Sequence, residues 1–156
     1  MASQNQLTFV NKAPEGVNEA YQSNNMPVTP HFEKNQFLTP HWHPNANEIT
    51  TCTKGSGQVV LISPNPSSPH QQGTAIKNVY DMTVNQSVFI PKGYFHYFIN
   101  TGTENFDLEL TFSNPNFDIL TLDNVVNLLP EYIRKPSLNG NPTIEILTVE
   151  NKTETV

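Results

Sequence analysis

Short runs in which apolar and polar residues alternate follow one another along most of the chain. Alternation with a period of two is typical of β-strands that bury one face, whereas a helix repeats every 3.6 residues. Clusters of proline, glycine and asparagine separate the runs, as at 44–47, 55–57 and 91–93. The pattern predicts strands at 28–32, 36–43, 49–54, 58–62, 75–82, 87–90, 96–100, 107–112 and 119–122, with a further short strand at 7–10.

A helical pattern is found only late in the chain. Either Thr121 or Asp123 is suited to cap a helix whose apolar positions continue as far as Pro130, which interrupts it. We expect a second helical turn over 131–134 and a last alternating strand over 143–149. The chain is therefore expected to be almost entirely β-structure, with one short helical segment near its C-terminal end.

The number and spacing of the strands predict a jelly-roll barrel, which closes many short strands into one core. The first 26 residues are polar and weakly patterned, and the residues after the helix end in a polar tail. We therefore divide the chain into an N-terminal arm (1–26), one β-domain (27–135) and a C-terminal extension (136–156).

Composition limits the classes of function. The 156 residues carry a net charge of −6 and only 8 lysines and arginines, which disfavours a nucleic-acid binder because such proteins need a dense basic face. No apolar run is long enough for a transmembrane helix, and the first residues do not resemble a secretory signal, so we expect a cytoplasmic protein without membrane contact. Cys52 is the single cysteine, so no internal disulfide can form.

Candidate chemistry is concentrated in one stretch and one distant histidine. His41 and His43 stand two residues apart in a predicted strand, which puts both imidazoles on one face. Glu48 begins the next strand after a turn rich in proline and asparagine, and His96 follows a Pro-x-Gly turn further on. Imidazoles with one carboxylate are a typical donor set for a divalent first-row metal, and manganese, iron, nickel, cobalt, copper and zinc all remain compatible with it.

These residues also carry a family resemblance. The first cupin motif, H-x-H followed by a glutamate and a glycine, is matched by His41, His43, Glu48 and Gly55. The second motif, P-x-G-x2-H-x3-N, is matched by Pro91, Gly93, His96 and Asn100. The leading glycine of each motif is missing. The chain is identified as a member of the cupin superfamily, which implies a double-stranded β-helix with a metal in the mouth of the barrel.

The stretch PHWHPNANE is similar to the form seen in bacterial oxalate decarboxylases, germins and spherulins. The resemblance implies that His41, His43, Glu48 and His96 bind one metal ion per chain, most often manganese in this branch. Oxalate decarboxylases carry a substrate-binding arginine three residues before the first of these histidines, where this chain has Leu38. Strict alternation points Leu38 away from the cavity unless the strand is bulged there. The single arginine, Arg134, lies beyond the barrel strands.

Alternation also nominates side chains for the pocket around the metal. The candidates are Phe37, Thr39, Cys52, Tyr94, Phe98 and Asn100. Plain alternatives compete for several of them: Cys52 as a buried inert thiol, Phe98 as core packing, and Asn100 as a turn-closing residue. Asp107 and Glu109 alternate against leucines and are expected to face solvent, although a cavity-facing Glu109 could serve as an acid or base.

Three functions fit these observations. The first is a mononuclear, manganese-dependent enzyme, similar to oxalate decarboxylase or oxidase, that acts on a small organic acid in an altered pocket. The second is a non-catalytic germin-like cupin that binds a ligand or metal, and the third is a metal-dependent isomerase or dioxygenase. A second titratable or cationic residue beside the metal would favour an enzyme, because fold alone does not decide function. We expect a small-molecule partner and a homo-oligomer, at least a dimer.

Overall fold

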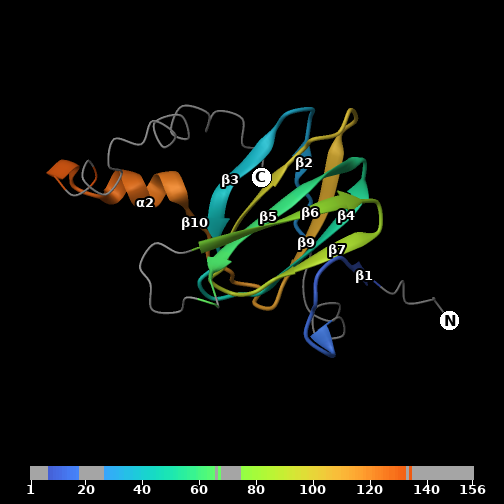
Figure 1. The fold of residues 1–156 in the computed structure, drawn as a ribbon, viewed down its shortest axis with the longest axis horizontal. Coiled ribbons are helices and arrows are strands. Elements are labelled where there is room, and N and C mark those ends of the chain that lie inside the picture. Colours follow the sequence, from blue (N-terminus) through green and yellow to red (C-terminus); the bar gives the residue numbers. More distant parts are fainter. Residues whose placement is uncertain (1–6, 18–26, 66, 68–74, 133, 135–156) are drawn as a thin grey trace.

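The computed structural model describes residues 7–17, 27–65, 67, 75–132 and 134. Their strands form two five-stranded sheets that face each other (Figure 1). One sheet has the spatial order β1 (Thr8–Phe9), β7 (Gln86–Ile90), β4 (Glu48–Lys54), β9 (Phe106–Phe112) and β2 (His31–Phe32). The other has the order β10 (Leu120–Thr121), β3 (Phe37–Trp42), β8 (Phe95–Ile99), β5 (Ser56–Pro64) and β6 (Ala75–Thr83).

All described strand pairs are antiparallel except β1 with β7. Neighbours in each sheet come from distant parts of the chain, as where β4 lies between β7 and β9. The predicted all-β jelly roll is confirmed. Strand bounds agree with the alternation to within a few residues, apart from the predicted 28–32 run, of which only His31–Phe32 is a strand and Val28 forms an isolated bridge to Leu110.

The core lies between the two sheets. Its buried side chains come from both, and alternation explains which ones: Leu108, Leu110 and Phe112 in β9 are buried, while the residues between them are more exposed. In β5, by contrast, Val59, Val60 and Leu61 are all buried, consistent with a strand covered on both sides. The barrel interior is thus filled mainly by aliphatic and aromatic groups, and a polar cluster inside it is an exception that requires explanation.

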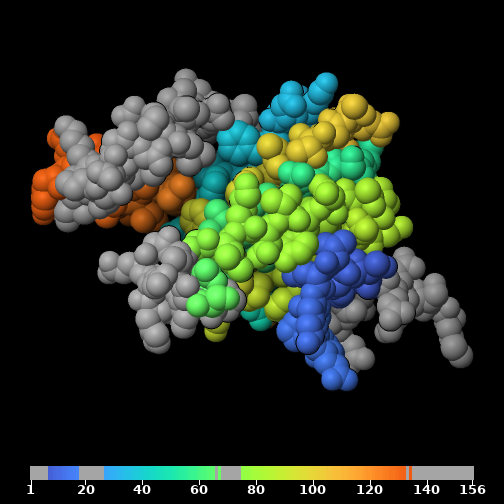
Figure 2. Space-filling model, viewed as in Figure 1, coloured from blue at the N-terminus to red at the C-terminus, as the bar shows by residue number. Residues whose placement is uncertain are grey.

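The described part of the N-terminal arm, residues 7–17, supplies the edge strand β1 and packs apolar side chains against Ile49 and Phe89 of the first sheet. Figure 2 shows this segment beside the region of β6 and β7. Phe9 packs on Ile49 and Phe89, and the Asn11 side chain both donates to and accepts from the backbone of Phe89, at 2.7 and 2.9 Å. The arm therefore covers apolar side chains that the sheet would otherwise expose.

The predicted helix is α2 (Leu122–Leu128), which projects from one end of the barrel (Figure 1). Thr121 occupies its N-cap position and Asp123 lies in its first turn, while the helix ends before Pro130 as expected. A further turn follows, in which the Arg134 amide donates to the carbonyl of Pro130 at 2.8 Å. No helix in the described part is long and apolar enough to cross a membrane. The predicted strand 143–149 and extension 136–156 lie outside the described residues.

Candidate metal centre

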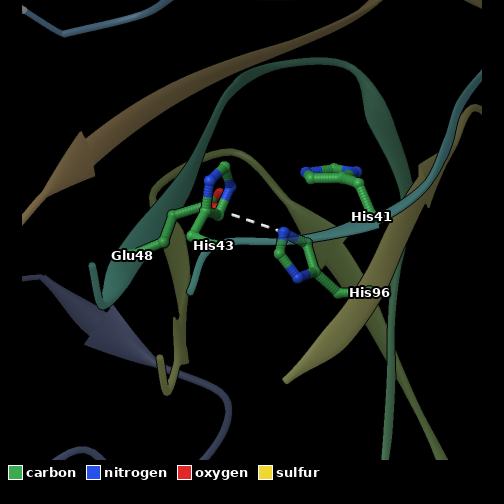
Figure 3. Close-up of side chains that lie close together, drawn as sticks. All are labelled: His41, His43, Glu48 and His96. Atoms are coloured by element: carbon green, nitrogen blue, oxygen red, sulfur yellow. Dashed lines mark hydrogen bonds and ion pairs between the residues drawn. The ribbon is translucent and has the colours of Figure 1, made fainter. Parts of the chain in front are cut away.

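Strand pairing brings four titratable side chains together inside the barrel. His41 in β3 lies directly opposite His96 in β8, His43 follows the end of β3, and Glu48 is the first residue of β4. All four are buried, and one nitrogen or oxygen atom from each lies within 4.8 Å of those from the other three. Figure 3 shows the side chains of His43, Glu48 and His96 close together, with the His41 ring on the other side of His96. The residues that the sequence nominated as metal ligands are therefore brought together.

Each imidazole is held in one orientation by a backbone carbonyl. The Nδ1 atoms of His41, His43 and His96 lie 2.7, 2.7 and 2.9 Å from carbonyl oxygens. These oxygens belong to Thr39, Asp118 and Tyr94, in that order. Because a carbonyl oxygen only accepts, each Nδ1 must be the protonated nitrogen, and a neutral ring then has a free lone pair on Nε2. Hydrogen bonds of this kind to Nδ1 fix the ring and prepare a histidine to bind a metal through Nε2.

Glu48 lies against two of these rings. Its Oε2 atom is 3.1 Å from the Nε2 atoms of both His43 and His96. The Nε2 of His43 is buried and has no hydrogen-bond partner in suitable geometry among the described residues. A lone pair on Nε2 and a carboxylate oxygen repel one another at this distance unless a proton or a metal ion lies between them. The donor set therefore fits a divalent metal ion, whose charge the carboxylate partly neutralises.

The protonation states agree with this fit. Burial and the neighbouring His96 lower the pKa of His41 to about 3, so its imidazole is neutral at neutral pH. Burial alone would raise the pKa of Glu48, but His96 and His43 beside it hold that pKa well below its ordinary value. Glu48 is thus ionised and His41 neutral at neutral pH, which is the state in which these two residues bind a metal.

The alternation of β3 is interrupted just before the first histidine. Phe37 and Leu38 lie opposite Ile99 and Phe98, but His41 lies opposite His96, so β3 has one more residue than β8 in this stretch. This β-bulge reverses the side to which the earlier residues point. Leu38 consequently faces the barrel interior with Phe98, and is buried in the core.

The bulge also changes the placement of two predicted pocket residues. Phe37 shares the side of Ile99, which is opposite to that of Phe98, and it is only half-buried. Its predicted parity with His41 is therefore wrong, because the parity rule counts residues and a bulge adds one. Thr39 is buried within the bulge, where its carbonyl accepts from His41.

The remaining pocket candidates separate into those near the cluster and those with structural roles. The Phe98 ring is fully buried, with its centroid 5.6 Å from that of His96 and 6.0 Å from that of His41. Tyr94 is partly buried against the core. The Asn100 amide donates to the carbonyls of Phe32 and Glu104 and accepts from the Gly102 amide, which is the turn-closing role.

Cys52 shares the inward side of Glu48 but lies four residues along β4, near its other end. Its thiol is buried and donates weakly to the carbonyls of Lys54 and Gly55, at 3.5 and 3.6 Å. Burial raises the pKa of this thiol, which disfavours the reactive thiolate. Cys52 is accordingly a packing residue within the core and is absent from the four-residue cluster.

Aromatic rings and an asparagine network enclose the His43 side of the site. Phe117 stacks on Phe112 with centroids 3.7 Å apart, and both rings meet His43 edge to face. The Asn45 side chain donates to the Asn116 carbonyl and the Asp118 carboxylate, at 3.0 and 3.1 Å, and accepts from the Asp118 amide at 2.8 Å. The segment 113–118 is thereby tied to the turn that carries His43.

Sequence reasoning missed two contributors to the site. Thr50 is fully buried and its hydroxyl donates to the Oε1 atom of Glu48. Its position two residues after Glu48, on the same side of the strand, could have identified it. The Asp118 carbonyl that orients His43 carries no such signal, because any residue supplies a carbonyl.

The charged residues outside the cluster are on the surface or near it. Glu109 is exposed, and Asp107 lies 2.5 Å from the exposed His31 ring, so both acids face away from the interior as expected. Every described lysine is exposed and Arg134 is half-buried beyond the barrel strands. Among the described residues, then, no cationic side chain is buried in the interior beside the four candidate ligands.

The described strands form a two-sheet β-barrel that holds a cluster of three histidines and one glutamate in its interior. The cupin family model matches residues 11–142, and the chain therefore belongs to the cupin family. This confirms the resemblance carried by the two motifs.

The chain is similar to curated germin-like proteins and to solved structures of oxalate decarboxylase and oxalate oxidase. Germin-like proteins 2-2 and 2-3 of Oryza sativa subsp. japonica are each 31% identical, over 70% and 71% of this chain and 44% of their own length. The chain thus spans less than half of these relatives. The oxalate decarboxylase of Lactobacillus farciminis, solved as a formate complex, is 19% identical with a TM-score of 0.63, over 83% of this chain and 34% of that one. An oxalate oxidase in complex with the substrate analogue glycolate is 20% identical with a TM-score of 0.61, over 81% and 63%.

Proposed function

We propose that this chain is a mononuclear metal protein in which His41, His43, Glu48 and His96 hold one divalent ion, with manganese the expected metal. The observation that carries the proposal is the orientation of the three imidazoles. Each gives its Nδ1 proton to a backbone carbonyl, which leaves Nε2 of a neutral ring free to bind a metal, and the Nε2 atoms of His43 and His96 lie 3.1 Å from one buried carboxylate oxygen. Nitrogen and oxygen donors suit manganese, and the likeness to oxalate decarboxylases and germins supports that choice.

We further propose that the protein is an enzyme acting on a small organic acid that carries no more than one negative charge. When bound, the metal supplies Lewis-acid polarisation of a substrate oxygen and a template for orientation. The chain supplies an apolar wall that excludes water, to which Leu38 and Phe98 contribute. Because no described cation lies in the interior, a dianion such as oxalate would be neutralised by the metal alone. A neutral or singly charged acid has a smaller desolvation cost.

A non-catalytic, germin-like binding function is the second candidate, and one observation favours it. Beyond the four candidate ligands and Thr50, the described rings that contact the cluster belong to phenylalanines, namely Phe98, Phe112 and Phe117. No second titratable side chain among them is placed to act as a general acid or base. Turnover of small hydroxy, keto or dicarboxylic acids by the manganese-loaded protein, measured as carbon dioxide, formate or peroxide release, separates the two functions.

The metal assignment is tested by loading the purified protein with manganese and measuring bound metal. We expect about one ion per chain, with loss of binding in His41→Ala and in Glu48→Gln, whose side chain keeps the shape of glutamate without its charge. Asp107→Asn is the matched control, because it removes a carboxylate on the surface. Full occupancy in His41→Ala would refute the ligand assignment.

We also propose a small-molecule partner, a homo-oligomer and a cytoplasmic location. Large apolar side chains that are exposed around β10 and α2 support the oligomer: Ile119, Leu120, Leu128 and Tyr132. Light scattering across a range of concentrations tests it. A monomer mass that does not change with concentration would contradict the oligomer.

A further inference from the structure

Thr50 has a polar side chain at a position where packing alone would favour an apolar residue. It is fully buried in β4, and its neighbours in the two adjacent strands are Val88 and Leu110, which are also buried. Valine has the same shape as threonine and the same preference for strands, without a hydroxyl to desolvate. A hydroxyl in such surroundings is costly unless it has a hydrogen-bond partner.

The hydrogen-bond partner of the Thr50 hydroxyl is the carboxylate of Glu48, one of the four candidate metal ligands. The Thr50 hydroxyl donates to Oε1 of Glu48, while Oε2 of the same carboxylate lies 3.1 Å from the Nε2 atoms of His43 and His96. The two carboxylate oxygens thus have different partners. Oε1 accepts a hydrogen bond from Thr50 in the same strand, and Oε2 faces His43 and His96. A carboxylate oxygen that already accepts a short, charge-assisted hydrogen bond is a weaker metal ligand than a free one.

We propose that Thr50 is a positioning residue that makes Glu48 bind the metal through Oε2 alone. This inference rests on the proposed metal centre and adds to it. With one oxygen engaged by Thr50, the protein contributes four donor atoms, and positions around the metal remain for a small ligand. Without the hydroxyl, the carboxylate is free to rotate and to chelate the ion with both oxygens, which removes one of those positions.

The test uses two pairs of variants that differ only by the hydroxyl: wild type against Thr50→Val, and Thr50→Ser against Thr50→Ala. Manganese affinity is measured by calorimetry on the full chain, and access of water to the bound ion by water-proton relaxation. We expect the hydroxyl-lacking member of each pair to show weaker affinity by about 10- to 100-fold, because the carboxylate is no longer oriented before the ion binds. We also expect lower relaxivity per bound ion, because the second carboxylate oxygen then takes the place of a bound water. Thr50→Ser restores both values toward those of wild type.

The outcomes separate this inference from the function on which it rests. If the wild-type protein binds no divalent metal, the proposed centre fails and the role of Thr50 with it. If wild type binds manganese but the affinity and relaxivity within each pair are equal, only the role of Thr50 fails. Should Thr50→Val not fold, the serine and alanine variants still differ by one hydroxyl in a site with more space. Equal loss in serine and alanine would show that the methyl group, and thus packing, is responsible, which also overturns the proposal.

Discussion

Leu38 lies directly opposite Phe98 across the β3–β8 pair, on the same side as the neighbouring pair of His41 and His96. Both members of the first pair are buried apolar residues, and both members of the second are candidate metal ligands. The bulge between the two pairs is what puts Leu38 on this side. An apolar residue thus occupies the interior at the position where the resemblance places the substrate-binding arginine of oxalate decarboxylases.

Leu38→Arg should therefore put a cation into the barrel beside the four candidate metal ligands. We expect metal-loaded Leu38→Arg to bind oxalate at least tenfold more tightly than wild type, which is about 1.4 kcal/mol. An unpaired buried charge should also lower the free energy of unfolding of the unloaded protein by on the order of 3 kcal/mol. Calorimetric titration with oxalate and urea unfolding measure the two effects.

Leu38→Met is the matched control, since it conserves volume and charge and should cost less than about 1.5 kcal/mol. Wild type and Leu38→Met should show little oxalate turnover. A folded Leu38→Arg protein with unchanged oxalate affinity would contradict the inward orientation of this residue.

The metal-free protein should lose stability on mild acidification. The pKa of His41 is about 3 in the folded chain against 6.5 in the unfolded chain, so the unfolded state binds more protons between these values. Stability is then fully present above pH 6.5 and falls as the pH drops toward 3, by up to ~1.4 kcal/mol per pH unit from this group. The lowered pKa of Glu48 acts in the same direction below its unfolded value of 4.5.

Urea unfolding of the metal-free protein across this pH range measures the slope. His41→Leu removes the titrating group, and its stability should change less between about pH 6.5 and about pH 5, where Glu48 is ionised in both states. An equal slope in wild type and His41→Leu would show that another group causes the acid sensitivity.

Gly55, the glycine of the first motif, should tolerate no side chain. Its φ is +70°, and a Cβ atom there would lie 2.1 Å from the carbonyl oxygen of Asn105. Gly55→Ala combines left-handed strain with a backbone clash and should lower the free energy of unfolding by ~3 kcal/mol or more. Gly93→Ala measures the cost of the left-handed conformation without a clash. Gly93 also has a positive φ, but a Cβ atom added there would have no atom within 4 Å. We expect Gly93→Ala to cost about 1–2 kcal/mol, and equal costs at both sites would argue against the clash.

The asparagine network should influence the metal centre from a distance. Asn45→Ala removes three hydrogen bonds to residues 116–118, and so loosens the Asp118 carbonyl that orients His43. We expect manganese affinity to fall by about tenfold and amide hydrogen exchange to accelerate in the segment 113–118. Gln58→Ala is the control, because it deletes an exposed side-chain hydrogen bond to Asp81. Unchanged exchange in Asn45→Ala would show that other contacts hold the segment.

The four candidate ligands could be proposed from the sequence because most of the information that points to them is local. His41 and His43 are related by strand periodicity, and motif spacing supplied Glu48 and His96. The strands could be predicted for the same reason, since one buried face imposes alternation on each of them. Glu48 in β4 and His96 in β8 are far apart in the sequence, and only the topology of the two sheets brings them together. His96 could therefore be included only through the family resemblance.

What could not be predicted depends on backbone irregularity and on long-range hydrogen bonds. The orientation of Phe37 was wrong because one extra residue before His41 shifts the register, and no sequence pattern marks that residue. The Asp118 carbonyl reaches His43 across 75 residues of chain, through a group that every residue possesses. Thr50 was recoverable in principle, but its role became visible only when its hydroxyl met the carboxylate of Glu48.

The bulge in β3 determines which side chains of that strand face the interior beside the four candidate ligands. Loss of the bulge at the same chain length would shift the pairing before His41 by one residue and exchange which of Phe37 and Leu38 faces the interior, while His41 stays opposite His96. The side chains beside the candidate ligands would then differ without a substitution among those ligands. Relatives of equal length that lack the bulge should therefore present the opposite set of β3 side chains to the interior.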